Sequence, residues 1–301
     1  MTPALVAIGR ARLAEARALL AAACPHDPAA DVADETLFGP ALGYESAQVH
    51  ALGVERGGQI AGLVVYCGAW LRLLAVAPQQ RNQGLGGALL EAAEAAIASA
   101  GADAVRVLDQ PGNYLAPGVD VRNHAAIDWL TKRGYRRRGE RVNLIVDVMQ
   151  NPFVSPGHRA ALCAGIAGYE LRRARNSDAG ALARVITEAF SAGWAFEVKR
   201  ALEGTPAGVH IAIECRSGQL AGFAAHDGNN RGRGWFGPAG TLPEHRGRGL
   251  GRALLCACLV DIAEAGHERC EVAWIGPRDF YQRTAGVSGE RRFAVLRKDL
   301  S

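Results

Sequence analysis

Residues 237–255 have the sequence GPAGTLPEHRGRGLGRALL, and residues 72–90 have the sequence RLLAVAPQQRNQGLGGALL. Each stretch places a proline ahead of the pattern Arg-x-x-Gly-Leu-Gly and ends in Ala-Leu-Leu. The arginines that open the two patterns, Arg81 and Arg246, lie 165 residues apart. This spacing is the length of a whole domain and not of a solenoid repeat, so the chain is expected to contain two copies of one fold.

The length and composition agree with two ordinary globular domains. A chain of 301 residues has room for two domains of about 150 residues each. Hydrophobic residues make up 49% of the chain and charged residues 21%, which suits a packed core and excludes a largely disordered protein. The net charge of +4 fits a protein that binds an anionic small molecule but is too small to require nucleic acid.

Neither a membrane span nor a metal site is expected. Charged residues interrupt the apolar N-terminal segment, and no run approaches the roughly 20 consecutive apolar residues of a membrane span. The seven cysteines are scattered, and Cys256 and Cys258 stand two apart in an apolar helical pattern, which is poor geometry for a metal pair. We therefore expect a cytoplasmic protein with reduced thiols, no metal and no membrane or nucleic-acid partner, as a monomer or homodimer.

Residues 150–168, QNPFVSPGHRAALCAGIAG, form the expected boundary between the copies. Pro152 and Pro156 are expected to interrupt regular structure there. Residues 141–148 have the pattern of a strand that closes the first copy, and residues 169–173 that of a strand that opens the second. The sequence therefore predicts an N-terminal domain over residues 1–150, a linker over 151–168 and a C-terminal domain over 169–301.

Strands and helices follow one another in the same order in both copies. In the second copy the predicted elements are a hairpin over 210–226, a strand over 235–242, a helix over 249–265, a strand over 269–274 and a short helix over 279–284. The matching elements of the first copy are predicted over 49–66, 71–76, 84–99, 104–108 and 123–132. Alternating strands and helices with antiparallel hairpins predict the α/β class, each copy with a mixed, mostly antiparallel sheet flanked by helices.

A strand followed by Pro-x-x-Arg-x-x-Gly-x-Gly and a helix is a phosphate-binding arrangement. The glycines let the backbone turn tightly and bring successive N–H groups close to a ligand, and the helix N-terminus adds unsatisfied donors and partial positive charge. Arg81 or Arg246 supplies a guanidinium that can reach a further phosphate oxygen. No Gly-Lys-Ser/Thr closes the loop, which excludes a P-loop, and the spacing disfavours the Gly-x-Gly-x-x-Gly of dinucleotide folds.

With these two loops the chain resembles the GNAT superfamily of acetyltransferases, in which such a loop binds the pyrophosphate of acetyl-CoA. The resemblance covers about residues 5–148 and 169–300. It implies acetyl-CoA as the acetyl donor, no metal, and a splayed strand before each loop (residues 73–77 and 239–243) whose backbone binds the pantetheine arm. The implied cofactor-binding residues are Gly240, Thr241, Leu242, Arg246, Gly247, Arg248, Gly249, Leu250, Gly251 and Arg252 in the second copy, and Val76, Arg81, Asn82, Gln83, Gly84, Leu85, Gly86 and Gly87 in the first.

The two copies differ in the short helix that follows the last strand of this pattern. Members of the superfamily often carry a tyrosine there, near the cofactor sulfur, that can protonate the leaving thiolate. Residues 279–287, DFYQRTAGV, match this feature and imply Tyr281 as the catalytic acid, with a core tyrosine as the alternative. The first copy has Leu130 at this position, and a leucine has no proton to give. The resemblance therefore implies catalysis in the second copy and a weak or silent first copy.

The sequence leaves the general base open. Many members of the superfamily use a glutamate on the splayed strand, but neither predicted splayed strand contains an acid. Glu197, the pair His226 and Asp227, and Glu244 are candidates, and a solvated surface role is the alternative for each. A chain of water molecules is also sufficient for an amine that is already partly neutral.

The expected reaction is attack of an acceptor amine on the thioester, with backbone N–H groups near Gly240–Leu242 stabilising the oxyanion. The tandem layout resembles bacterial glucosamine/glucosaminide N-acetyltransferases, which favours an amino sugar as the small-molecule acceptor. A mycothiol-synthase-like acceptor and a peptide or protein N-terminus are the enzymatic alternatives, and a non-catalytic acetyl-CoA-binding regulator is the alternative of another class. Trp194 and Phe196 fall where family members form the acceptor pocket, with a core or hinge role as the alternative.

Overall fold

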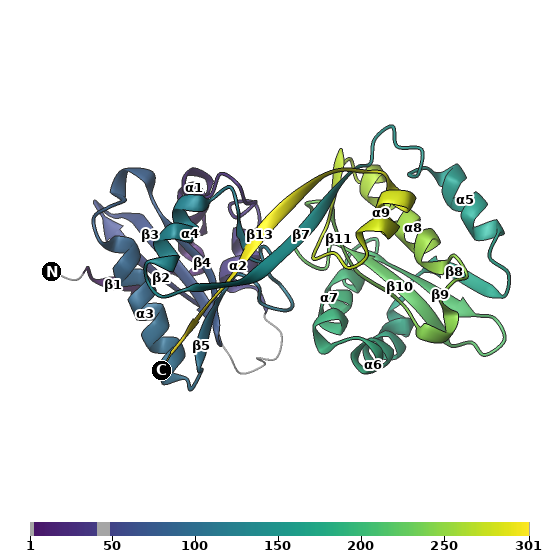
Figure 1. The fold of residues 1–301 in the computed structure, drawn as a ribbon, viewed down its shortest axis with the longest axis horizontal. Helices are drawn as coiled ribbons and strands as arrows, with labels where there is room; N and C mark the ends of the chain where they lie inside the picture. The colour runs from purple at the N-terminus through teal and green to yellow at the C-terminus, as the bar shows by residue number, and fades with distance from the viewer. Residues whose placement is uncertain (1–2, 41–48, 301) are drawn as a thin grey trace. The chain divides into compact units, whose positions relative to one another are not determined.

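The computed structural model describes residues 3–40 and 49–300, which fold as two compact units (Figure 1). Unit 1 comprises residues 1–141 and 292–301, and unit 2 comprises residues 142–291. Each unit has a central sheet with helices packed on both faces. The expected fold class, α/β with two tandem domains and mixed, mostly antiparallel sheets, is confirmed.

Unit 1 contains the elements of the first copy. These are β1 (Leu5–Ala7), the 3₁₀ turn Arg10–Arg12, α1 (Leu13–Ala23), α2 (Ala33–Phe38), β2 (His50–Arg56), β3 (Gln59–Cys67), β4 (Trp70–Val76), the 3₁₀ turn Pro78–Gln80, α3 (Leu85–Ser99), β5 (Ala104–Val107), β6 (Val119–Asp120), α4 (His124–Thr131), and parts of β7 (Arg136–Asp147) and β13 (Val287–Asp299). The sheet order is β1-β2-β3-β4-β5-β13, antiparallel except for the parallel pair β4–β5. One apolar cluster lies under α1 and α2 and another under α3 and α4.

Unit 2 repeats this architecture. Its elements are α5 (Pro156–Ala164), β8 (Tyr169–Arg173), the 3₁₀ turn Asn176–Asp178, α6 (Ala179–Ala189), α7 (Ala192–Leu202), β9 (Val209–Glu214), β10 (Leu220–His226), β11 (Trp235–Thr241), the 3₁₀ turn Pro243–His245, α8 (Leu250–Glu264), β12 (Arg269–Val272) and α9 (Arg278–Ala285). The sheet order is β7-β12-β11-β10-β9-β8, and β11–β12 is the parallel pair. α8 covers one face, and α6 and α7 cover the other.

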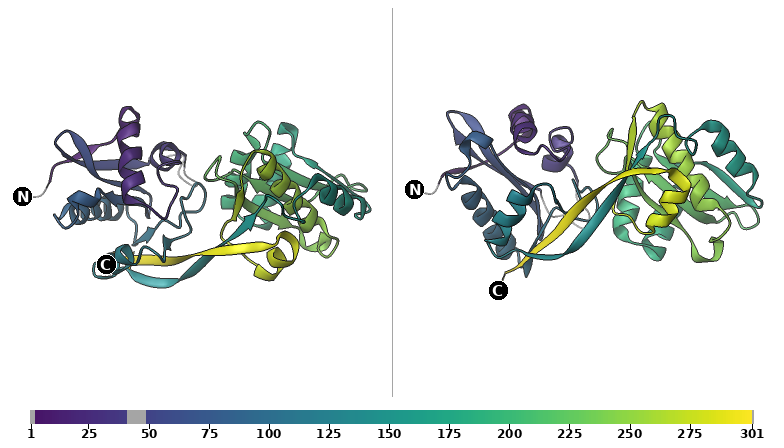
Figure 2. Two further views of the ribbon diagram at one scale, coloured as in Figure 1. Left: turned by 90° about the horizontal axis from the view of Figure 1, so that it is seen from above. Right: turned by 45° about the horizontal axis from the view of Figure 1, so that its top comes forward.

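Two long strands belong to both units. β7 begins in unit 1, and from residue 142 it lies in unit 2, where it pairs with β12. β13 begins in unit 2, and from residue 292 it lies in unit 1, where it pairs with β5. The two strands run side by side in both views of Figure 2. The units therefore differ from the expected domains 1–150 and 169–301, because the residues of a strand reveal its buried face but not the strand beside it.

The expected linker over residues 151–168 is a folded part of unit 2. It contains α5, whose N-cap residue Ser155 accepts a hydrogen bond from the His158 N–H at 3.0 Å, and α5 packs against α8. Pro156 is the first residue of this helix, where its missing N–H leaves no hydrogen bond unmade. The proline therefore starts a helix here, and the prediction of a linker was wrong.

Three observations concern the described residues, 3–40 and 49–300. None of their helices combines the length and the apolar character needed to cross a membrane. No group of three or more His, Cys, Asp and Glu side chains among them could hold a metal ion. The seven cysteines, all within these ranges, are free thiols, and four of them are buried.

Candidate functional site

The two Arg-x-x-Gly-Leu-Gly loops have the same backbone conformation. In unit 2, Gly247 and Gly249 have φ angles of 78° and 83°, and in unit 1 Asn82 and Gly84 have φ angles of 60° and 81°. These left-handed angles favour glycine, and asparagine is among the residues that tolerate them best. Gly249 and Gly84 are the N-cap residues of α8 and α3 and carry no side chain, so the N–H groups of each first turn face outward. Both loops therefore fit a diphosphate group.

The arginine of each loop fastens the loop to the strand before it. Arg246 Nε donates a hydrogen bond to the Thr241 carbonyl at 3.2 Å, and Arg81 Nε donates to the Val76 carbonyl at 3.3 Å. Arg81 Nη2 also donates to the Ala23 carbonyl at 3.3 Å. Both side chains are exposed. The arginines therefore hold the loops in place as well as presenting positive charge to an anion.

A gap opens between the two parallel strands of each unit. In unit 2, Trp235 pairs with Glu271 and Phe236 pairs with Val272, and beyond these residues β11 and β12 diverge. The chain after β12 turns toward β7, because the Trp274 N–H donates to Asn143 Oδ1 at 2.8 Å. In unit 1 the first two residues of β4 likewise pair with the last two residues of β5, Arg106 and Val107, and the two strands then separate. Within the described part of the chain, the separation leaves one edge of β11, and one edge of β4, without a neighbouring strand next to the loop.

The pairing of β10 with β11 decides which backbone groups face this gap. The Leu242 N–H donates to the Ala221 carbonyl at 2.9 Å, and the same alternation turns the Gly240 N–H toward β10. The Thr241 N–H therefore faces the gap, as does its counterpart Val76 in unit 1. This corrects the expected oxyanion donors: within Gly240–Leu242, the N–H group of the middle residue alone points to the site.

Tyr281 lies where the gap begins. Its ring packs edge-on against Phe236, the last residue of β11 that pairs with β12, with ring centroids 6.3 Å apart. Phe280 packs against the same ring at 5.2 Å. Burial raises the pKa of Tyr281 to about 12, and the nearby Cys270 adds to the shift, so the hydroxyl keeps its proton at neutral pH. Its position suits a proton donor, although the ring also packs on the apolar cluster under α8.

The equivalent position in unit 1 is Leu130, as the sequence predicts. Trp129 packs on the first turn of α3 as Phe280 packs on the first turn of α8. A Cβ atom added at Gly86 would lie 3.3 Å from the Trp129 ring, and one added at the equivalent Gly251 would lie 3.7 Å from the Phe280 ring. Leu130 follows Trp129 as Tyr281 follows Phe280, and the leucine is buried in the core. Unit 1 therefore has an apolar group where unit 2 has a hydroxyl.

A second difference lies in the gap itself. The residue after β5 is Leu108, whose N–H donates to the Leu71 carbonyl at 2.9 Å, and the residue after β12 is Ala273, whose N–H donates to the Phe236 carbonyl at 3.1 Å. Leu108 packs against the apolar clusters on both faces of its sheet, so its side chain lies between the strands. The shorter side chain of Ala273 does not reach between the strands in this way in unit 2. Neither residue belongs to a sequence motif, so the sequence alone does not reveal this pair.

An aromatic group borders the open strand of unit 2 on the side of α6 and α7. Phe190 stacks on Trp194 with ring centroids 5.2 Å apart and meets the edge of Phe223 at 5.5 Å. A Cβ atom at Gly240 would lie 2.6 Å from the Phe190 ring, so the strand needs glycine there. Trp194 is 37% exposed, whereas Phe196 lies near the guanidinium of Arg200. A glycine inside a strand can indicate that another group approaches the backbone closely, but the sequence does not show that the group at Gly240 is the Phe190 ring.

The candidates for the general base do not meet at the gap. Both ring nitrogens of His226 lie 3.3 Å from carboxylates, Nδ1 from Asp227 and Nε2 from Asp261. Burial opposes the charged imidazole, but the two carboxylates raise the pKa of His226 above its usual value. Glu197 is buried on α7, and Glu244 is exposed in the loop. His226 and Asp227 therefore belong to a separate charged cluster, and the base stays open.

Two family models match the chain, one in each unit. Residues 47–137 match the acetyltransferase (GNAT) domain, and residues 180–286 match the acetyltransferase (GNAT) family. A comparison with curated proteins found no match. The two matched regions contain both Arg-x-x-Gly-Leu-Gly loops and, in unit 2, Tyr281.

Solved structures share the fold over the whole chain. The glucosamine N-acetyltransferase region of a fungal multidomain GH3 β-N-acetylglucosaminidase superposes with a TM-score of 0.76 at 18% identity, covering 98% of this chain and 38% of that one. A GCN5-related N-acetyltransferase from Sphaerobacter thermophilus gives 0.68 at 21% identity, with 98% and 95% covered. A tandem GNAT protein from the clavulanic acid pathway gives 0.67 at 18%, with 98% of both chains covered. The chain thus belongs to the GNAT acetyltransferase superfamily, as a tandem protein with one such domain in each half.

Proposed function

We propose that this protein is an acetyl-CoA-dependent N-acetyltransferase that modifies the primary amine of a small molecule, and that unit 2 carries out the reaction. The observation that carries the proposal is the combination, in unit 2, of the diphosphate loop, an open gap and a protonated tyrosine at its start. Unit 1 keeps the loop but has Leu130 and Leu108 at the matching places. Unit 1 is therefore proposed to bind coenzyme A weakly or structurally, without turnover.

Each part of unit 2 has a distinct task in this proposal. Acetyl-CoA supplies an acetyl group activated as a thioester. The loop N–H groups and Arg246 bind the diphosphate, and the Thr241 N–H is the hydrogen-bond donor that the open strand directs toward a carbonyl oxygen. Tyr281 holds the proton that a leaving thiolate requires.

The proposed acceptor is an amino sugar, bound beside Trp194. The exposed indole, backed by Phe190, offers a rigid aromatic face next to the open strand at Gly240. Such a face attracts both the apolar C–H face of a sugar ring and a nearby ammonium group. One structure of the same fold is named as a glucosamine N-acetyltransferase region, which supports this choice.

Trp194→Ala is expected to raise the KM for the amine roughly tenfold, because the aromatic face is lost, while the KM for acetyl-CoA stays unchanged. Met149→Ala is the matched control, since Met149 is another exposed large apolar side chain, at 56% exposure. Steady-state kinetics with each substrate varied in turn measure both constants. An unchanged amine KM, or an equal rise in both constants, would exclude Trp194 from acceptor binding.

Release of free thiol from acetyl-CoA, followed with a thiol reagent across a panel of amines, tests the proposed function. The panel contains glucosamine and related amino sugars, cysteinyl amino sugars of the mycothiol-precursor kind, and short peptides with free N-termini. Turnover is expected with the amino sugars. Preference for either of the other groups would replace the proposed acceptor, and tight acetyl-CoA binding with no turnover on any amine would favour a non-catalytic regulator.

A further inference from the structure

Unit 2 contains a buried ionic cluster at the end of α8 opposite the diphosphate loop. Asp261 accepts hydrogen bonds from Arg173 Nη2 at 2.8 Å and from His210 Nε2 at 2.7 Å, and His226 Nε2 lies 3.3 Å away. The Asp261 side chain is 5% exposed. His226 continues the cluster to Asp227, which also accepts from a backbone N–H of the following loop. Asp261 lies eleven residues beyond Leu250, or about 16 Å along the helix.

The fold itself does not require this cluster. Strand registers and the 165-residue repeat place Ala7, Leu52, Tyr66 and Ala96 of unit 1 at the positions of Arg173, His210, His226 and Asp261, respectively. Unit 1 thus builds the same sheet and helix with uncharged side chains at all four places. Removing charges from water is costly, and apolar residues often serve stability as well or better. The four charged and titratable groups are therefore not needed to build this sheet and helix.

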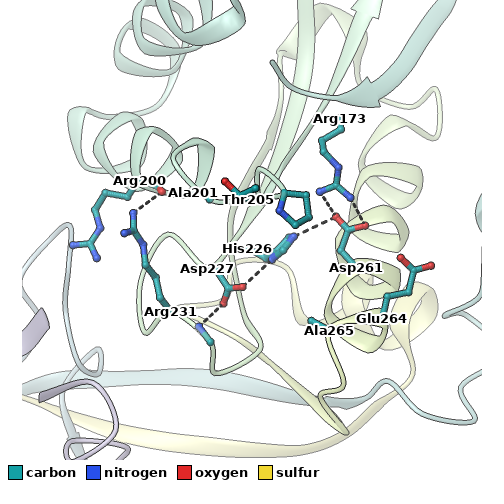
Figure 3. A pocket seen from close by; sticks show the side chains of 14 residues that line it. Arg173, Arg200, Ala201, Thr205, His226, Asp227, Arg231, Asp261, Glu264 and Ala265 are labelled. Carbon is teal, nitrogen blue, oxygen red and sulfur yellow. Dashed lines mark hydrogen bonds and ion pairs between the residues drawn. The ribbon is translucent and has the colours of Figure 1, made fainter. Parts of the chain in front are cut away.

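A pocket of about 450 Å³ lies over this cluster (Figure 3). Its floor includes Arg173, His226 and Asp261, and its walls come from the end of α7, the loop after β10 and the last turn of α8. The volume lies within the range of about 300–1,000 Å³ that is typical of small-molecule sites. All of the lining residues belong to unit 2.

Opposite walls of the pocket carry opposite charges. Figure 3 shows Arg231 on one side, where its Nη2 donates to the Arg200 carbonyl at 2.6 Å, and Glu264 on the other. Arg231 also pairs with Glu203 at 3.0 Å, but both side chains are well exposed, at 40% and 55%, so this pair is weak and a ligand carboxylate can replace Glu203. Glu264 is the last residue of α8, where the helix dipole adds further negative charge.

We propose that this pocket binds a small zwitterion of dipeptide size, with its carboxylate at Arg231 and its ammonium group at Glu264 and the C-terminal end of α8. The floor cluster fixes the ends of β8, β9, β10 and α8 around the ligand. This site is separate from the diphosphate loop and from the gap beside Tyr281, and it needs no acetyl transfer.

Calorimetric titration of the whole protein, saturated with coenzyme A so that no acetyl group is present, tests the proposal with alanyl-alanine as the probe. Binding is expected, and Arg231→Ala and Glu264→Gln are each expected to weaken it at least about tenfold, which corresponds to about 1.4 kcal/mol. N-acetyl-alanyl-alanine lacks the ammonium charge and alanyl-alanine amide lacks the carboxylate charge. Each of these analogues is expected to bind the unmodified protein at least about tenfold more weakly than alanyl-alanine does. Glu203→Gln removes the ion pair between Glu203 and Arg231, and this variant is expected to bind the probe as well as the unmodified protein or better.

Controls separate this site from the proposed acceptor site. Trp194→Ala is expected to leave the affinity for alanyl-alanine unchanged, and so is Glu188→Gln, which removes an exposed ion pair on α6. The proposal is overturned if alanyl-alanine does not bind, if the singly charged analogues bind equally well, or if binding depends on Trp194 and not on Arg231 and Glu264. Loss of acetyl transfer would affect none of these readouts.

Discussion

Tyr281→Phe is expected to lower turnover by about 10²-fold and to leave the affinity for acetyl-CoA nearly unchanged. Burial raises the pKa of the Tyr281 hydroxyl to about 12, so it is protonated at neutral pH and can donate a hydrogen bond to the departing thiolate, whose thiol has a pKa of roughly 8.5. Phenylalanine keeps the ring that packs on Phe236 and Phe280 and removes the donor. Turnover per folded molecule, measured together with Tm, checks the prediction.

The acid role also constrains the pH profile. Because the pKa of Tyr281 is raised to about 12, its deprotonation cannot lower activity below about pH 10, so any loss of rate there belongs to another group and persists in Tyr281→Phe. A purely structural tyrosine predicts the reverse result: a lower Tm with wild-type turnover in the enzyme that remains folded. That outcome would remove Tyr281 from the chemistry.

Gly249→Val is expected to raise the KM for acetyl-CoA by at least about tenfold, the equivalent of about 1.4 kcal/mol. Gly249 has a φ of 83°, which a β-branched residue adopts only at a cost of about 1–3 kcal/mol, so the loop would leave the conformation that suits a diphosphate. Gly84→Val in unit 1 is a closely matched control, because Gly84 has a φ of 81° and occupies the same N-cap position. Calorimetry with coenzyme A and steady-state kinetics on both variants measure the effect.

The matched pair separates strain from function. Both substitutions are expected to lower Tm by similar amounts, since each imposes the same backbone conflict, and turnover is expected to survive in Gly84→Val. Activity that persists in Gly249→Val and disappears in Gly84→Val would reverse the roles of the two units. Wild-type affinity in a well-folded Gly249→Val protein would show that this loop does not bind the diphosphate.

Much of the site could be predicted because a repeated loop carries its own conformation. Arg81 and Arg246 open two segments that take nearly identical φ angles, and the order of strands and helices around them follows from periodicity. The contrast between Leu130 and Tyr281 was also visible, because the two short helices align once the loops do. Local sequence determined each of these features.

The features that sequence did not reveal depend on partners distant in the chain. Residues 141–148 have the pattern of a strand. The strand β7 is longer, and its neighbours, β12 and β13, come from much later in the chain, so its place in the sheet could not be predicted from its own residues. Gly240 lies against the ring of Phe190, which follows the last residue of α6. The partners of Asp261 come from β8, β9 and β10. In the sequence, Asp261 is a charged residue in an otherwise apolar stretch of α8, and this is an indication of a buried cluster but not of its partners.

Because β13 ends in unit 1 and β7 ends in unit 2, the two units are completed on the ribosome in the reverse of the usual order, in which the N-terminal domain is completed first. Unit 2 is continuous from residue 142 to residue 291, whereas unit 1 needs residues 292–299 to pair with the free edge of β5. At about 5–20 residues per second, synthesis of the intervening residues takes about 8–30 s, during which the edge of β5 lacks this neighbour. The C-terminal domain of the nascent chain is therefore complete first, and the N-terminal domain is completed afterwards by a strand that emerges behind it.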